Sequence, residues 1–146
     1  MKVRSLGHVV VKVTDLERSE GFYTGILGLD VCARYDENGM KMTFFSLGNH
    51  HDLALMEVTG EQPAGGDQAV GLHHVAFCIG TSMDQLKEAK AELDAAGITM
   101  DPIDHVVTKS LYLDDPDGNT VELYVDVSDE WRRDPQIIAN VQPLEL

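Results

Sequence analysis

Basic residues are scarce in this sequence, and it has no long apolar run. Eleven lysines and arginines stand against 25 aspartates and glutamates, which gives a formal net charge of −14. Such a charge repels phosphate backbones and anionic lipid surfaces, so we expect neither nucleic acid nor membrane as a partner. No apolar segment reaches the length of a bilayer-spanning helix or of a secretion signal, and we therefore expect a cytoplasmic protein.

Cysteine is also scarce, which excludes a fold built on a disulfide framework. The sequence has two cysteines, Cys32 and Cys78, and a chain with 43% hydrophobic residues can build its core without them. Cys78 lies in an apolar run and is interpreted as a small buried residue. A length of 146 residues suits one compact domain and is too short for two ordinary ones. Because the acidic charge argues against nucleic acid and membrane partners, we expect the protein to bind a small molecule.

An internal repeat is the main guide to the architecture. Residues 7–13, Gly-His-Val-Val-Val-Lys-Val, match residues 73–79, His-His-Val-Ala-Phe-Cys-Ile. Each is a short β-branched or apolar run opened by a histidine, and each predicts a strand.

A helix is predicted directly after each of these strands. Asp15 can cap the first helix, which is expected to run to Leu27. Ser82 and Gln85 form a capping box for the second helix, which Gly97 stops. The apolar residues of the second helix recur at helical spacing and leave its charged residues largely to solvent, as in an amphipathic surface helix.

Each helix is followed by three further strand candidates, and the last two of each set form a hairpin. In the first half of the chain the hairpin strands are residues 42–47 and 52–58, and in the second half they are residues 110–114 and 120–125. The second hairpin turns at residues 115–119, Asp-Pro-Asp-Gly-Asn, where proline and glycine supply the backbone angles of a turn. Strand, helix and three strands, repeated once, is an α+β plan of two βαβββ modules.

The two modules are expected to form a single domain over residues 1–146. Their bounds are about 1–59 and 71–127, with a linker at 60–70 that contains glycine and proline and a C-terminal tail at 128–146 that has no counterpart in the repeat. We expect the strands of both modules to form a curved mixed sheet around a metal-binding cavity, with the helices covering one face.

The two-residue period of a strand predicts which side chains share the cavity face. The apolar residues of 9–13 face the first helix, so His8 points the other way. The same reasoning directs His74 away from the second helix. In the last hairpin the alternate apolar positions leave Tyr112 and Glu122 on this other face. A glutamate between apolar strand residues is informative, because a buried carboxylate needs a partner or a metal.

His8, His74 and Glu122 make a ligand set of two imidazoles and one carboxylate. This set binds Fe(II), Mn(II), Zn(II) or Ni(II) and leaves coordination positions open. Two simpler readings stay open: a strand histidine can be a hydrogen-bonded structural residue, and Glu122 can pair with a lysine. We favour one divalent metal per chain, because the histidines occupy the same position in two repeats and Glu122 falls on the same face. His50 and His51 lie in a turn and are interpreted as polar loop residues.

These residues and their surroundings resemble the vicinal oxygen chelate superfamily, which includes glyoxalase I, fosfomycin and bleomycin resistance proteins and the type I extradiol dioxygenases. The resemblance runs from Leu6 to about Asp126. Its parts are residues 7–9, 22–23, 27–29, 74–77, 115–119 and 122–124. Within the superfamily, the stretch from His105 through residues 110–113 into the turn is similar to the end of catechol 2,3-dioxygenases. Residues 50–55 also resemble that family.

The resemblance implies how such a site would work. His8, His74 and Glu122 would bind Fe(II), or sometimes Mn(II), which chelates both oxygens of a catecholate and activates O2. His105 would be the acid/base group, and Tyr112 would donate a hydrogen bond to the substrate oxygen on the metal. The implied function is extradiol ring cleavage of a catechol-like aromatic diol. A homodimer is expected from the family precedent and from the open edges of paired modules.

Two other classes of function remain open. A lyase, isomerase or transferase like glyoxalase I, the epimerases or the fosfomycin resistance proteins would use the metal only as a Lewis acid. A binding protein of the bleomycin resistance kind would sequester a ligand without metal or chemistry, although the full triad argues against it. Oxygen uptake separates the dioxygenase from the Lewis-acid enzymes.

Overall fold

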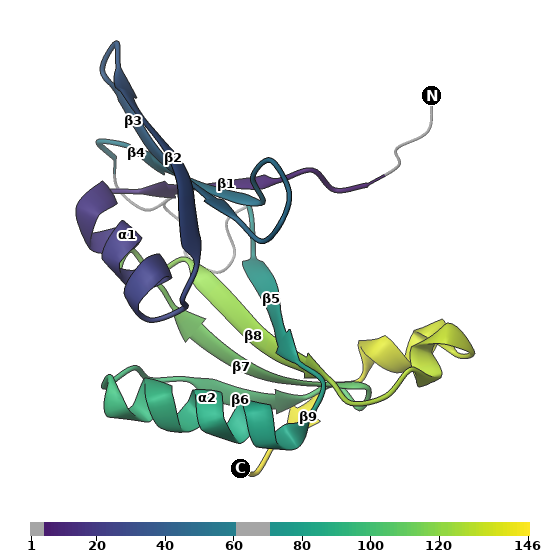
Figure 1. Ribbon diagram of the computed structural model, residues 1–146. Coiled ribbons are helices and arrows are strands. Elements are labelled where there is room, and N and C mark those ends of the chain that lie inside the picture. Colours follow the sequence, from purple (N-terminus) through teal and green to yellow (C-terminus); the bar gives the residue numbers. More distant parts are fainter. Residues whose placement is uncertain (1–4, 61–70) are drawn as a thin grey trace. The chain divides into compact units, whose positions relative to one another are not determined.

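The computed structural model describes residues 5–60 and 71–146 (Figure 1). The chain divides into two compact units, Met1–Ala69 and Val70–Leu146, and each is described by itself. Each unit contains the order strand, helix and three strands, which the second unit extends with two 3₁₀ helices and a short further strand, so the predicted α+β fold of two βαβββ modules is confirmed. Among the described residues, no helix has the length and apolar character needed to cross a bilayer.

Within its described residues, 5–60, the first unit contains a four-stranded sheet and one helix. Its elements are β1 (Val9–Val13), α1 (Leu16–Gly25), β2 (Asp30–Glu37), β3 (Met40–Ser46) and β4 (Leu53–Glu57). The strand order is β1-β4-β3-β2, in which β1 runs parallel to β4 and the other neighbours are antiparallel. The parallel pairing aligns Val9 with Leu53, so the residues that precede β1 and β4 lie at the same end of the sheet.

The sequence predicts the start of α1 better than its end. Asp15 caps the helix as expected, because its carboxylate accepts a 2.9 Å hydrogen bond from the backbone N–H of Arg18. The helix ends at Gly25 rather than at Leu27. Tyr23 anchors α1 on the sheet: it is 1% exposed, and its ring centroid lies 5.9 Å from that of Phe45 on β3.

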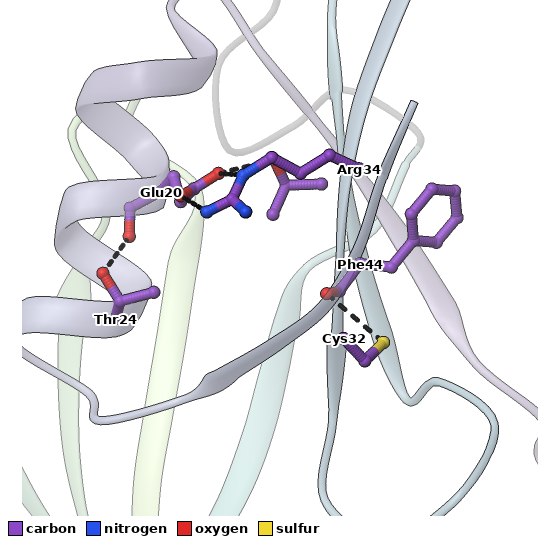
Figure 2. Close-up of polar contacts among 6 residues, drawn as sticks. Glu20, Thr24, Cys32, Arg34 and Phe44 are labelled. Atoms are coloured by element: carbon purple, nitrogen blue, oxygen red, sulfur yellow. Dashed lines mark hydrogen bonds and ion pairs between the residues drawn. The ribbon is translucent and has the colours of Figure 1, made fainter. Parts of the chain in front are cut away.

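A polar network also joins α1 to the sheet (Figure 2). Glu20 of α1 forms an ion pair with Arg34 of β2 and accepts a 2.8 Å hydrogen bond from the hydroxyl of Thr43 on β3. The hydrogen-bonded Arg34 guanidinium holds the pKa of the Glu20 carboxyl below its ordinary value. Thr43 is fully buried, so this contact gives its hydroxyl the partner that a buried polar group requires.

The second unit contains a five-stranded sheet covered by one helix. Its elements are β5 (His74–Gly80), α2 (Met83–Ala95), β6 (Asp101–Asp104), β7 (Thr108–Asp114), β8 (Thr120–Asp126) and β9 (Gln142–Pro143). The strand order is β5-β8-β7-β6-β9, with β5 parallel to β8 and the other pairs antiparallel. Two short 3₁₀ helices, η2 (Glu130–Arg132) and η3 (Pro135–Ala139), precede β9.

The start of α2 and the last hairpin turn follow the sequence signals. Ser82 and Gln85 form the predicted capping box. In the turn, the carboxylate of Asp115 accepts hydrogen bonds of 2.9 Å from the backbone N–H groups of Asp117 and Asn119. These contacts close the turn and hold β7 and β8 in register.

Burial alternates along the strands as the two-residue period predicts. In β1, Val11 and Val13 are buried while Val10 is 40% exposed. In β5, however, Cys78 is exposed, so its interpretation as a small buried residue is wrong. Cys78 has the same parity as His74, which places it on the face opposite to its apolar neighbours.

The C-terminal tail has structure that the repeat did not predict. β9 pairs with β6, with Ile103 opposite Pro143 and Asp104 opposite Gln142. The tail therefore lies beside the segment that contains His105.

Candidate metal centre

His74 and Glu122 lie together on one face of the second unit. His74 opens β5, and Glu122 lies in the middle of β8, the parallel neighbour of β5. The register places Thr120 opposite His74 and Ala76 opposite Glu122, so both side chains project from the same face. Nε2 of His74 lies 3.1 Å from Oε2 of Glu122. The structure thus brings two of the three predicted ligands into contact.

Glu122 is a buried carboxylate with defined partners. Its exposure is 8%, and its strand neighbours Val121 and Leu123 are buried as well. Oε1 accepts a 2.6 Å hydrogen bond from the hydroxyl of Ser110, which is fully buried on β7. Because Oε2 faces His74, a serine and a histidine hold this carboxylate, rather than the lysine considered from the sequence.

His73 holds the imidazole of His74 from its other side. The two Nδ1 atoms lie 2.7 Å apart, so one ring donates and the other accepts. When Nδ1 of His74 accepts from His73, its Nε2–H donates to the Glu122 carboxylate; when Nδ1 donates instead, Nε2 presents a lone pair beside Oε2, the arrangement in which both atoms can bind one cation. Two atoms that occupy adjacent positions on one metal ion, at roughly 2.1 Å each, are about 3 Å apart. The pair therefore fits a shared metal ion.

Tyr112 and His105 extend this group of side chains. Tyr112 lies on β7 directly opposite Glu122, and its ring packs edge-on to His74 with 5.5 Å between centroids. The Tyr112 hydroxyl is 3.1 Å from Nε2 of His105. Burial raises the pKa of this hydroxyl, and the charge of Glu122 and a hydrogen bond to it raise the pKa further. Four of the predicted site residues thus form one connected group.

His105 lies in a tightly held connection between β6 and β7. Its backbone N–H donates to the carbonyl of Thr108 at 3.0 Å, and the next residue, Val106, has a φ of 70°. Positive φ is unfavourable for a β-branched residue and persists only where the surroundings enforce it. Asp104 supplies such contacts, because its carboxylate accepts a 2.6 Å hydrogen bond from the N–H of Val106 and pairs with Lys109. The position of the His105 backbone is therefore well defined.

His8 has two imidazole neighbours within the first unit. The centroid of the His51 ring lies 4.1 Å from that of His8 and 4.5 Å from that of His50. One ring nitrogen from each of the three residues lies within 4.8 Å of the others, a spacing that can hold a metal ion. Burial lowers the pKa of His51, and the nearby His8 and His50 lower it further, against the opposing charge of Asp52.

The sequence reasoning missed the place of His50 and His51 beside a predicted ligand. The available signal was the His-His-Asp run directly before β4. Because β1 and β4 are parallel neighbours, residues that precede β4 lie close to His8, which precedes β1. That pairing joins segments distant in sequence, so the local pattern did not reveal it.

Comparison with known proteins identifies the family. Residues 5–123 match the model of the Glyoxalase/Bleomycin resistance protein/Dioxygenase superfamily. The chain belongs to this superfamily. The matched range includes all five predicted site residues of this superfamily member, from His8 to Glu122.

Two proteins similar to this superfamily member are named as dioxygenases of aromatic diols. The chain is 35% identical over 120 residues to biphenyl-2,3-diol 1,2-dioxygenase 2 of Rhodococcus globerulus, a match that covers 82% of this chain and 61% of that protein. It is 30% identical over 131 residues to catechol-2,3-dioxygenase of Bacillus subtilis (strain 168), with 88% of this chain and 44% of that protein covered. The chain therefore spans less than two thirds of either relative.

A solved structure of the superfamily shares the fold. The crystal structure of a glyoxylase/bleomycin resistance protein/dioxygenase domain from Frankia sp. EAN1pec matches with a TM-score of 0.73 and 21% identity. The match covers 91% of this chain and 99% of that chain. At this identity the likeness concerns the fold, and function must be argued from the site.

Proposed function

We propose that this superfamily member is an extradiol dioxygenase that cleaves the ring of a catechol-like aromatic diol with O2. In this proposal one Fe(II) is bound by His8, His74 and Glu122. The observation that carries it is the connected group in the second unit, where His74 and Glu122, the proposed ligand pair, lie next to Tyr112, the proposed hydrogen-bond donor, and His105, the proposed base. The two relatives named for aromatic diols support the same reaction class.

The three ligands are argued from donor chemistry and from the repeat. His74 and Glu122 present a nitrogen and an oxygen at the separation of adjacent ligands on one ion. His8 precedes the first strand of its module, much as His74 opens the first strand of the other module. When bound, the metal would supply a Lewis acid for the diol oxygens and electrons for O2.

Tyr112 is the proposed hydrogen-bond donor to the substrate. Its hydroxyl is protonated at neutral pH, as in any phenol, and the raised pKa opposes loss of this proton, so the hydroxyl can donate to a diol oxygen that carries negative charge. Tyr112 and Glu122 are direct partners on β7 and β8, so an oxygen held next to the Glu122 carboxylate lies within reach of this hydroxyl.

His105 is the proposed group that takes up and returns a proton. Its Nε2 faces the hydroxyl of Tyr112, which connects it to the substrate side of the site. Ring cleavage needs one group that gains and loses a proton near neutral pH, and histidine is the side chain whose ordinary pKa suits that task.

His51 is a second candidate for the proton-transfer role. Its ring packs against His8, so it lies beside the ligand that the first unit contributes. Separate replacements, His51→Gln and His105→Gln, distinguish the two residues. The variant that lacks the working base should lose roughly 10²–10⁴-fold in kcat, and the other should change little.

A Lewis-acid enzyme is the second candidate function. The superfamily also contains glyoxalases, and a metal-binding pair beside a base can move a proton on a carbonyl substrate without O2. The matches cover only 61% and 44% of the two dioxygenase relatives, so they do not exclude this alternative.

Oxygen uptake tests the proposal directly. Protein purified without oxygen and loaded with Fe(II) should consume O2 with catechol or biphenyl-2,3-diol and form a yellow ring-opened product. Methylglyoxal with glutathione should give no thioester above the rate without protein. The opposite pair of results would assign the Lewis-acid function instead.

A further inference from the structure

The C-terminal tail, residues 128–146, reaches the proposed acid/base residue. Nδ1 of His105 lies 2.9 Å from the backbone carbonyl oxygen of Asn140. We propose that this carbonyl makes the tail a working part of the site: it holds His105 in the tautomer with the proton on Nδ1 and so presents Nε2 to the hydroxyl of Tyr112. The kinetic consequence of this contact rests on the proposed function, whereas the tautomer does not.

The chemistry of the two partners sets the tautomer. A backbone carbonyl only accepts hydrogen bonds, so His105 must donate from Nδ1. In a neutral ring the other nitrogen then carries no proton, and Nε2 can only accept. In the protein without substrate, the Tyr112 hydroxyl, 3.1 Å away, is the donor to it, and Glu122 competes for the same proton. A histidine held in this state is ready to take up a proton at Nε2.

Asn140 is held on both sides, which fixes the direction of its carbonyl. On the N-terminal side, its side-chain Nδ2 donates to the carbonyl of Ile137 in η3 at 2.7 Å. On the C-terminal side, β9 pairs Gln142 with Asp104, the residue directly before His105. The carbonyl and the imidazole are therefore positioned by the same local pairing of β9 with β6.

The tail contributes little to an apolar core. In residues 129–146, all of which the structure describes, no side chain is fully buried, and Trp131, Ile138 and Val141 are 38%, 60% and 69% exposed. Burial of apolar surface is the dominant favourable term in folding, so this segment adds little stability by that route. Its contacts with β6 and with His105 are made by backbone polar groups. Such contacts can orient the His105 side chain, and they bury little apolar surface.

Nuclear magnetic resonance of ¹⁵N-histidine-labelled protein comprising residues 1–146 reads the tautomer directly. The His105 signals are assigned by their loss in His105→Gln. At a pH where the ring is neutral, we expect a protonated Nδ1 and an unprotonated Nε2. A chain that ends at Ala139 lacks both the carbonyl and β9 and should show the mixed tautomers of a free imidazole. A chain that ends at Leu144 keeps both features and serves as the matched control.

Kinetics of the same chains separate this proposal from the proposed reaction. The chain that ends at Ala139 should lose roughly tenfold to a hundredfold in kcat, with KM for the diol changed by less than about twofold. A protonated Nε2 at His105 in the chain of residues 1–146 overturns the proposal, whether or not the shortened chain folds. An unchanged tautomer in the chain that ends at Ala139 overturns it too. If truncation abolishes the Nδ1-protonated tautomer but the protein consumes no O2 with any diol, the positioning role of the tail stands and the proposed dioxygenase function is wrong.

Discussion

Nε2 of His74 lies 3.1 Å from Oε2 of Glu122, across two neighbouring parallel strands of one sheet. Each side chain has a second hydrogen-bond partner. Nδ1 of His73 is 2.7 Å from Nδ1 of His74, and the Ser110 hydroxyl donates to Glu122 at 2.6 Å. Metal sites need such supporting contacts, because they set the direction and basicity of the ligands. Single substitutions can test the ligand pair and its supports.

Ser110→Ala should destabilise the protein and weaken metal binding. The substitution leaves a buried carboxylate oxygen without its donor, which should lower the free energy of unfolding by about 1–3 kcal/mol. Urea denaturation in the presence of a chelator measures this for the metal-free protein. Thr120→Ala is the control, because it removes a hydroxyl of the same sheet that donates to the exposed Asp114 and should cost less than about 0.5 kcal/mol. An equal decrease in the free energy of unfolding in both variants would show that the hydrogen bond between Ser110 and Glu122 stabilises the protein no more than a surface hydrogen bond does.

Tyr112→Phe should lower the kcat of ring cleavage by about tenfold or more and leave the bound metal unchanged, because it removes a donor and no ligand. An absorbance titration of the phenols gives a second check. Burial and Glu122 raise the pKa of Tyr112 above its ordinary value of 10.0, so this phenol should stay protonated where exposed tyrosines ionise. The absorbance change on tyrosine ionisation should therefore be as large in Tyr112→Phe as in the wild type. A smaller amplitude would mean that Tyr112 is an ordinary exposed phenol.

Glu20→Gln should make stability less sensitive to acid. The pKa of Glu20 in the folded protein lies below its ordinary value of 4.5, chiefly because of the hydrogen bond from Arg34. A depressed pKa gives stability that is present above the unfolded value and is lost as the pH falls through the folded value, here below 4.5. The effect should be small, because the Arg34 side chain is 62% exposed. Urea unfolding from about pH 6 to about pH 3 measures it, and an unchanged pH profile in the variant would contradict it.

Local sequence signals predicted the helix starts and the last hairpin. The cap at Asp15, the capping box at Ser82 and the turn at Asp115 lie where they were expected, because each depends on contacts within a few residues. The two-residue period predicted a shared face for His74 and Glu122, and the register of β5 and β8 shows one.

Contacts between distant segments could not be predicted in the same way. His51 lies beside His8 because β1 and β4 are parallel neighbours, and Asn140 lies beside His105 because β9 pairs with β6. Neither pairing follows from the residues next to it in sequence. The place of His8 in the metal triad, the choice of Fe(II) and the homodimer stay predictions from the repeat and from the resemblance.

His50→Ala and His51→Ala should each keep the bound metal, because neither residue belongs to the proposed triad. The test matters because the ring nitrogens of His8, His50 and His51 lie within 4.8 Å of one another and form a competing site. Metal analysis of both variants beside Glu122→Ala distinguishes the two locations. Loss of metal in the histidine variants together with its retention in Glu122→Ala would move the metal to the three imidazoles.

Metal content of Glu122→Ala is the most direct test of the proposed centre. Protein purified without oxygen, loaded with Fe(II) and then desalted should retain about one metal ion per chain in the wild type. Glu122→Ala should lose most of it, because the substitution removes the only carboxylate of the triad. Asp126→Ala, on the same strand, should bind as the wild type does and controls for the loss of a negative charge. Wild-type metal content in Glu122→Ala would contradict the triad.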